Sequence, residues 1–342
     1  MTVALIMLII ALVIIFGFTD IGSDMAFMQH FISPPQHFTY TGHSNYISGL
    51  SWSPNSEFIA SSSGDGTVQI WNAATGKLAR TYRGHQGDVT TVAWSPDGTY
   101  IASGGLDSTV QVWNAATGVL KYTYKGHSDA VFAVTWSPDE TRIASASNDG
   151  TVQVWEVGMG KRLVSYNSVV VKNSATVFNS VAWSPDGQSI AVGGNGQVSV
   201  WDATTGKHIT YYGYNSGITH IVAWSPDSKY IAIGSSDNTA QVWDIATHSA
   251  VYTFSQHNAD VNTLAWSPDG KRIVSGDGDG IVKVWDALSG QHVYTYRGHS
   301  DMYIGHFTSG AASAVNSIAW SPNGKRIASG SNDHTVQVWA AQ

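Results

Sequence analysis

A histidine, a serine and an aspartate recur together at fixed spacing along this chain of 342 residues. In four sets the histidine precedes the serine by 18 residues, and the serine precedes the aspartate by four. These residue types form acyl-transfer triads, in which histidine activates a serine nucleophile and aspartate orients the histidine. A nucleophile must be exposed and unique, however, so a recurring set indicates a structural role. The sets are His43, Ser61 and Asp65; His85, Ser103 and Asp107; His127, Ser145 and Asp149; and His257, Ser275 and Asp279.

Other patterns for catalysis or ligand binding are weak. The 13 histidines include no His-Glu-x-x-His motif, and the chain has no cysteine and no glycine-rich nucleotide loop. Residues 277–280 read Asp-Gly-Asp-Gly but lack the further spaced acids and the terminal glutamate of a calcium loop. We therefore expect no catalytic residue, no cofactor and no metal site.

The charge pattern also excludes one class of partner. Charged residues make up only 12% of the chain, and the net charge is −7. Most acids are aspartates at turn positions, where the side chain bonds to the nearby backbone. No run of lysine or arginine supplies the attraction that dominates nucleic-acid affinity, so we expect no binding of DNA or RNA.

The fourteen tryptophans show how the chain is organised, because they fall in seven pairs. Members of a pair lie 19 residues apart, or 18 in the fourth pair. The first members of successive pairs are separated by 42, 42, 47, 41, 42 and 54 residues. A period near 40 with short alternating segments predicts a propeller, in which each repeat forms a small sheet that is buried against its neighbours.

One repeat, residues 84–126, contains four strand patterns, which we denote a to d in chain order. Runs of β-branched and aromatic residues are separated by turn sequences such as Ser-Pro-Asp-Gly. The predicted strands are Val89–Trp94, Tyr100–Ser103, Thr109–Trp113 and Leu120–Tyr124. The sequence therefore predicts an all-β, seven-bladed propeller of four-stranded antiparallel blades.

These residues resemble the WD-repeat β-propeller family in nearly all of the chain after its N-terminal extension. The Gly-His pair, the strand-b serine, the aspartate before strand c and the tryptophan closing strand c stand at family spacing. The resemblance implies that histidine, serine, aspartate and tryptophan form a hydrogen-bonded tetrad within each blade. The four sets above then gain Trp71, Trp113, Trp155 and Trp285, and the seventh repeat supplies His299, Ser329, Asp333 and Trp339.

Such a tetrad would stabilise the fold, because each unpaired buried member costs about 1–3 kcal/mol. The fourth and fifth repeats depart from the pattern. The fourth has Ser174 in place of the histidine and a shortened turn at 194–196 without the aspartate. The fifth keeps Asp237 but has Asn215 and Ile233. We expect these two blades to be the most weakly fastened.

The seventh repeat ends just after the strand-c Trp339 and has no outer strand of its own. Residues 37–41, His-Phe-Thr-Tyr-Thr before a Gly-His pair, match the strand-d sequences of the other repeats. We therefore expect the N-terminal strand to complete the last blade, which would remove an unprotected sheet edge.

Residues 2–18 are apolar and uncharged. As a helix they would span roughly 26 Å, close to a bilayer core of about 30 Å. We expect residues 1–18 to form a transmembrane or signal-anchor helix, 19–35 a linker, and 36–342 the propeller. A cleaved signal peptide is the competing interpretation, although no basic segment precedes the apolar run. The flanking Asp20 and Asp24 tilt the expected orientation weakly toward the exported side.

In the resembling family, the loops between strands d and a and between strands b and c emerge on one face, the top face, where partners usually dock. The candidate binding residues lie on this face. Between His299 and the next strand the chain carries an insertion, residues 302–313. Its aromatic and aliphatic residues are of the kinds enriched in interface hot spots, although they could equally fold back on the blade. The candidates in this insertion are Tyr303, Ile304, His306 and Phe307, and weaker candidates elsewhere are Tyr46 and Leu106.

The resemblance implies a noncatalytic protein-interaction scaffold that binds a protein or peptide on its top face. With the apolar N-terminal segment, we expect a membrane-tethered, monomeric propeller. One alternative is a small-ligand sensor or enzyme that uses the central channel, but the expected strand-a sequences look mostly neutral. Another is a docking subunit of a larger assembly. Fold alone does not decide among them.

Overall fold

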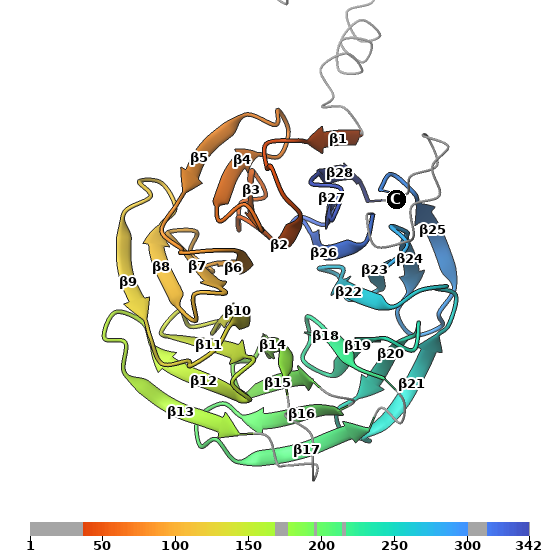
Figure 1. Ribbon diagram of the computed structural model, residues 1–342. Helices are drawn as coiled ribbons and strands as arrows, with labels where there is room; N and C mark the ends of the chain where they lie inside the picture. Colours follow the sequence, from red (N-terminus) through yellow and green to blue (C-terminus); the bar gives the residue numbers. More distant parts are fainter. Residues whose placement is uncertain (1–36, 168–176, 195–196, 214–216, 300–312, 342) are drawn as a thin grey trace, which may run out of the picture. The chain divides into compact units, whose positions relative to one another are not determined.

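The computed structural model describes residues 37–167, 177–194, 197–213, 217–299 and 313–341. Residues 37–342 form one compact unit. Its strands make seven four-stranded antiparallel sheets, which stand as blades around a ring (Figure 1). The predicted fold class is therefore confirmed for this part of the chain.

Each blade runs from the ring centre outward through strands a, b, c and d. The a strands all end at a tryptophan: β2 (Ile47–Trp52), β6 (Val89–Trp94), β10 (Val131–Trp136), β14 (Phe178–Trp183), β18 (Thr219–Trp224), β22 (Val261–Trp266) and β26 (Val315–Trp320). The b strands follow after a tight turn: β3 (Phe58–Ser63), β7 (Tyr100–Gly105), β11 (Arg142–Ser147), β15 (Ser189–Gly194), β19 (Tyr230–Ser235), β23 (Arg272–Asp277) and β27 (Arg326–Ser331).

The c strands carry the second tryptophan of each pair: β4 (Val68–Asn72), β8 (Val110–Asn114), β12 (Thr151–Glu156), β16 (Gln197–Asp202), β20 (Ala240–Asp244), β24 (Val282–Asp286) and β28 (Val336–Ala340). The d strands form the rim: β5 (Leu78–Tyr82), β9 (Leu120–Tyr124), β13 (Arg162–Asn167), β17 (His208–Gly213), β21 (Ser249–Phe254), β25 (His292–Tyr296) and β1 (His37–Tyr40). In the second repeat, strands b and c end one or two residues later than predicted.

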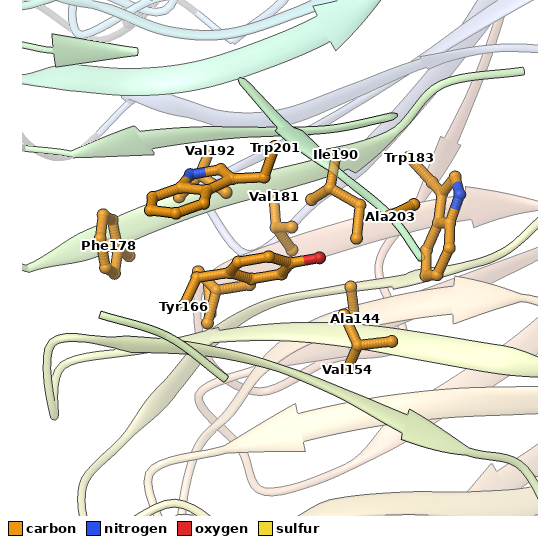
Figure 2. Packing of buried hydrophobic residues seen from close by; sticks show 12 residues of the cluster. Ala144, Val154, Tyr166, Phe178, Val181, Trp183, Ile190, Val192, Trp201 and Ala203 are labelled. Carbon is orange, nitrogen blue, oxygen red and sulfur yellow. The ribbon is translucent and has the colours of Figure 1, made fainter. Parts of the chain in front are cut away.

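The core lies between neighbouring blades. Strand b of each blade is buried along nearly its whole length, because both of its faces are covered. At the boundary of blades 3 and 4, Tyr166, Trp201 and Ile190 pack in one apolar layer (Figure 2). Because its faces are covered only by neighbouring sheets, no single blade could keep this apolar surface from water by itself.

Strand β1 closes the ring by pairing with β28, His37 opposite Trp339 and Tyr40 opposite Val336 (Figure 1). Its side chains also contact blade 1. The Tyr40 ring stacks on Trp71 with centroids 4.4 Å apart. Phe38 covers the turn at Gly76, which has a positive φ of 66° and where an added Cβ would meet the ring, so the turn favours glycine. The predicted closure by the N-terminal strand is confirmed.

The predicted N-terminal helix and linker lie outside the described residues. Within the described part of the chain, no helix is long and apolar enough to cross a membrane.

Candidate functional site

The loops between strands d and a and those between b and c emerge at one face of the ring, which we call the top face. In blade 1, His43 Nδ1 lies 2.8 Å from Asp65 Oδ2 and His43 Nε2 lies 2.8 Å from Ser61 Oγ. Trp71 Nε1 donates to the same serine oxygen at 3.2 Å. An ionised carboxylate only accepts, so His43 donates from Nδ1 and accepts the serine proton at Nε2. The tetrad therefore joins both top loops to strands b and c.

Three other blades repeat the contact of histidine with aspartate and serine as the sequence places them. The histidine side chains are buried in all of them. The tryptophan bond is present in blade 2, whereas Trp155 and Trp339 have no hydrogen-bond partner for Nε1 among the described residues. The distances from histidine to aspartate and to serine are 3.0 and 2.8 Å at His85, 2.9 and 2.8 Å at His127, and 2.7 and 2.7 Å at His299.

Blade 6 departs from the prediction. His257 Nδ1 lies 2.6 Å from Asp277 Oδ2, and the predicted partner Asp279 is exposed. Ser275 and Trp285 occupy their predicted places, at 2.7 and 3.1 Å. Asp277 ends strand β23, and its other oxygen accepts the backbone N–H of Asp279. The assignment of Asp279 to the tetrad was therefore wrong.

The carboxylates of Asp65 and Asp107 are held in the ionised form. Burial acts to raise the pKa of Asp65 and Asp107, but hydrogen bonds from histidine, threonine and the backbone outweigh it and lower the pKa of both. Burial also lowers the pKa of His127. The serines, by contrast, are fully buried, so no substrate can reach them. This Ser-His-Asp arrangement lacks the accessible nucleophile that acyl transfer requires.

In blade 5 the tetrad is incomplete, as its sequence suggests. Ile233 stands in strand b where five other blades have serine, and Trp243 Nε1 donates instead to Gln241 at 2.9 Å. Asp237 still accepts bonds from Thr239. Ser174 and Asn215, which replace the tetrad histidine in blades 4 and 5, and Asn195 in the shortened turn of blade 4 lie outside the described residues.

A second contact between blades was not foreseen from the sequence. Tyr40, three residues before the tetrad histidine, donates to Gln69 Oε1 of the next blade while stacking on its tryptophan. Gln69 in turn donates to the Gly42 carbonyl. The signal was available, because tyrosine precedes histidine by three and glutamine precedes tryptophan by two in several repeats. Among the described residues, tyrosine and glutamine also pair at Tyr82 with Gln111, Tyr124 with Gln153 and Tyr296 with Gln337.

The predicted binding residues that the structure describes lie on the top face. Leu106 is 48% exposed, in the loop that carries Asp107. Tyr46 is half-buried, and its hydroxyl donates to Asp88 of the next blade at 2.7 Å. This bond occupies the polar end of Tyr46, so Leu106 is the freer of the two. The other four candidates, Tyr303, Ile304, His306 and Phe307, lie outside the described residues.

Polar side chains on the innermost strands connect neighbouring blades rather than form a separate site. Asn316 Nδ2 donates to the Ile47 carbonyl at 2.9 Å, and Asn262 and Asn179 make similar bonds. His220 lies 3.5 Å from Asp260. Among the described residues, no three His, Asp or Glu side chains gather as a metal site would require.

Two family models match the sequence. The model described as "IFT122 first beta-propeller" matches residues 46–252, more than half of the chain. The model described as "WD domain, G-beta repeat" matches residues 248–286 and 290–340. Together the matches span the blades described above.

Proposed function

The chain belongs to the WD40-repeat β-propeller family that includes the first propeller of IFT122, and on this premise we propose that its top face binds a protein or peptide partner. Propellers of this family typically act as noncatalytic scaffolds for protein interactions. For this chain, the proposed activity is noncatalytic binding by a monomeric propeller.

The observation that carries the proposal is the burial of the tetrads under the top loops. Hydrogen bonds of the histidine to aspartate and serine fix the backbone of these loops in blades 1, 2, 3, 6 and 7. Rigid loops lose less conformational entropy when a partner binds. Leu106 projects from a loop fastened in this way. An apolar side chain on a rigid loop can therefore serve as an anchor in an interface.

We place the partner contact on the same face at the insertion of residues 302–313. It begins three residues after His299 and ends at the buried Ser313, whose carbonyl accepts a bond from Ser331. Both ends of the insertion are thus tied to the top of blade 7. Its aromatic residues supply the larger part of the proposed contact.

A photocrosslinking amino acid at position 106 of the full chain tests the site, with position 159 as the matched control. Met159 is 75% exposed in a turn on the opposite face. We expect one discrete protein adduct from position 106 that disappears when residues 302–312 are replaced by a short Ser-Gly turn. An adduct from position 159 alone would place the partner on the other face, and no protein adduct would favour a small ligand in the channel.

We further propose that residues 2–18 tether the propeller to a membrane, with the propeller on the exported side. The support is the uncharged apolar run itself. Retention of the chain in membranes after alkaline carbonate washing would agree with the tether, and a chain lacking residues 2–18 should be released. Digestion of the propeller by protease added outside intact cells would agree with export. Protection of the propeller from this protease would indicate the opposite orientation.

A further inference from the structure

The tryptophans that end the innermost strands do not all point the same way. Most donate Nε1 to a carbonyl of the preceding blade: Trp52 to Ala319, Trp136 to Ala93, Trp224 to Ala182 and Trp266 to Ala223, at 3.1–3.2 Å. Trp94 and Trp183 instead donate to Gly98 and Gly187 in their own turns, at 3.0 and 3.2 Å. The Nε1 atoms of these two indoles therefore bond to their own a–b turns and not to the preceding blade.

The sequence of the preceding blade differs at these two boundaries. In five blades, the residue directly before the strand-a tryptophan is alanine. It is Ser51 in blade 1, which precedes the blade of Trp94, and Thr135 in blade 3, which precedes the blade of Trp183. Ser51 Oγ accepts the backbone N–H of Trp94 at 2.9 Å. At these two boundaries a larger, polar residue thus replaces the alanine of the other blades. Trp320 lies in blade 7, and the preceding blade 6 has Ala265 at this position. Its Nε1 nevertheless has no partner among the described residues.

At the boundary of blades 3 and 4, an arginine of the chain itself contacts the Trp183 indole. Arg142 Cζ lies 4.8 Å from the centre of the Trp183 ring, and Arg142 donates to the Ala203 carbonyl at 3.1 Å. The guanidinium is also 3.7 Å from Asp139. Figure 2 shows Trp183 and Ala203 at this boundary. A planar cation on an indole face with a carbonyl acceptor is a favourable arrangement.

The boundary of blades 1 and 2 has the same parts without the arginine. Phe58 stands at the strand-b position of Arg142, and Trp94 and Ala115 stand at those of Trp183 and Ala203. A cavity of about 460 Å³ opens here on the bottom face, where the a–b and c–d turns lie. Its lining includes Phe58, Ile70, Trp94 and Ala115. A volume of this size accepts a large side chain or a small ligand.

We propose that this cavity binds the guanidinium of an arginine side chain from a partner protein. The guanidinium would stack on Trp94 and donate to the Ala115 carbonyl, as Arg142 does at the equivalent place. One acidic residue, Asp97, lines the cavity, and the lining residue Asn55 donates to the exposed Glu57 carboxylate at 3.1 Å. Arginine is favoured over lysine because its planar group stacks and donates in fixed directions.

One lining residue opposes a cation. Arg80 lies at the cavity, where the equivalent residue of blade 3 is Val164. Its guanidinium donates to the Thr117 carbonyl at 2.9 Å and to the Ala116 carbonyl, so its donors are used by the neighbouring turn. Its charge nevertheless repels a second guanidinium, and replacing it with valine should strengthen binding.

The test uses the full chain labelled with 5-fluorotryptophan, with the Trp94 resonance assigned from its loss in Trp94→Phe. The probe is N-acetyl-arginine methylamide, with the citrulline and lysine analogues as controls. We expect a saturable shift of the Trp94 resonance with the arginine probe at millimolar concentration. The Trp183 resonance should stay in place, because Arg142 already fills that boundary.

Three variants make the result specific. Phe58→Arg places a guanidinium where Arg142 has one and should weaken probe binding about tenfold or more, which corresponds to about 1.4 kcal/mol. Arg80→Val should strengthen it. Arg142→Ala should open the second boundary and make the Trp183 resonance respond. The proposal is overturned if the Trp94 resonance does not move, if citrulline moves it equally, or if a folded Phe58→Arg chain binds the probe unchanged.

Discussion

Blade 6 shows how one side chain decides which carboxylate serves a buried histidine. In blade 1, the Thr67 hydroxyl donates to Asp65 and holds this aspartate toward His43. Blade 6 has Ile281 at the equivalent position, which offers no hydroxyl. Asp277, where blade 1 has Ser63, reaches the histidine from the end of strand b instead. The histidine keeps an anionic acceptor, but the acceptor comes from two residues earlier in the chain.

Substitution of each aspartate separates the two assignments. Both oxygens of Asp277 accept hydrogen bonds, one from His257 Nδ1 and the other from the backbone N–H of Asp279 and Ile281. We expect Asp277→Asn to lower the free energy of unfolding by about 1–3 kcal/mol, because in either orientation the amide N–H₂ would face one of these donors in a buried site. Asp279→Asn, the matched control, should change it by less than about 0.5 kcal/mol, as exposed substitutions usually do. Urea unfolding of the three proteins measures both effects. A larger loss for Asp279→Asn would restore the assignment made from spacing.

The tetrads also predict loss of stability in acid. The pKa of Asp65 and Asp107 is lower in the folded chain than in the unfolded one, so their contribution is full above about pH 4 and is lost as the pH falls further. The pKa of His127 is also lowered, so its contribution begins to fall below about pH 6.5. Urea unfolding from pH 7.5 to 3.5 should show both phases. Stability that rises on acidification would contradict this.

Spacing predicted four of the five histidine–aspartate pairs because these blades share the same turn length and the same threonine. It failed at Asp279 because counting residues does not show which of two nearby carboxylates the turn directs inward. The bonds of the Trp94 and Trp183 indoles to their own turns were missed for a related reason. Ser51 contacts Trp94 from a neighbouring blade, and this contact exists only after the ring has formed.

At the scale of elements, the outer strand of each blade also fastens the next blade. Tyr82 ends β5 in blade 1 but stacks on Trp113 of blade 2 at 4.3 Å and donates to Gln111 at 2.6 Å. At the boundary of blades 5 and 6, both partners differ. Phe254 at the end of β21 replaces the tyrosine and stacks on Trp285, and Lys283 of β24 replaces the glutamine. Phenylalanine leaves no hydroxyl to be paired, and Lys283 donates instead to the Gln256 carbonyl. Strand β1 does the same work for blade 1.

Removing β1 should therefore damage two blades. Deletion of residues 37–40 exposes the edge of β28 and uncovers Trp71, which is fully buried in the intact chain. We expect a loss of at least about 3 kcal/mol, typical of removing a large buried aromatic side chain, together with aggregation at the open edge. Deletion of residues 25–28 is the matched control, because it shortens the chain before β1 equally. Equal melting temperatures for the two deletions would show that β1 is not needed for closure.

At the scale of the whole molecule, the ring is only approximately sevenfold. Its general form followed from the sequence because the tryptophan period and the turn sequences recur in every blade. The differences between blades are harder to read, because they arise at pairs of residues in separate repeats. Such pairs include Ser51 with Trp94 and Phe254 with Lys283. The proposed arginine cavity on the bottom face is one of these differences.

The strength of fastening should also vary around the ring. Blades 1 and 2 have complete tetrads, whereas blade 5 has Ile233 in place of the serine, and Trp201 Nε1 of blade 4 has no partner among the described residues. In a chain of repeats, opening is governed by each unit and its two interfaces. We therefore expect amide hydrogens of β16, β17, β20 and β21 to exchange about tenfold or more faster than those of β4, β5, β8 and β9.

Native-state hydrogen exchange followed by mass spectrometry measures this difference blade by blade. His85→Asn, which gives blade 2 the residue type that blade 5 has at position 215, is the matched test of cause. It should raise exchange in β8 and β9 toward the rates of blade 5 and leave the blades opposite in the ring unchanged, because each blade contacts only its neighbours. Uniform protection around the wild-type ring would mean that packing between blades, rather than the tetrads, sets local stability.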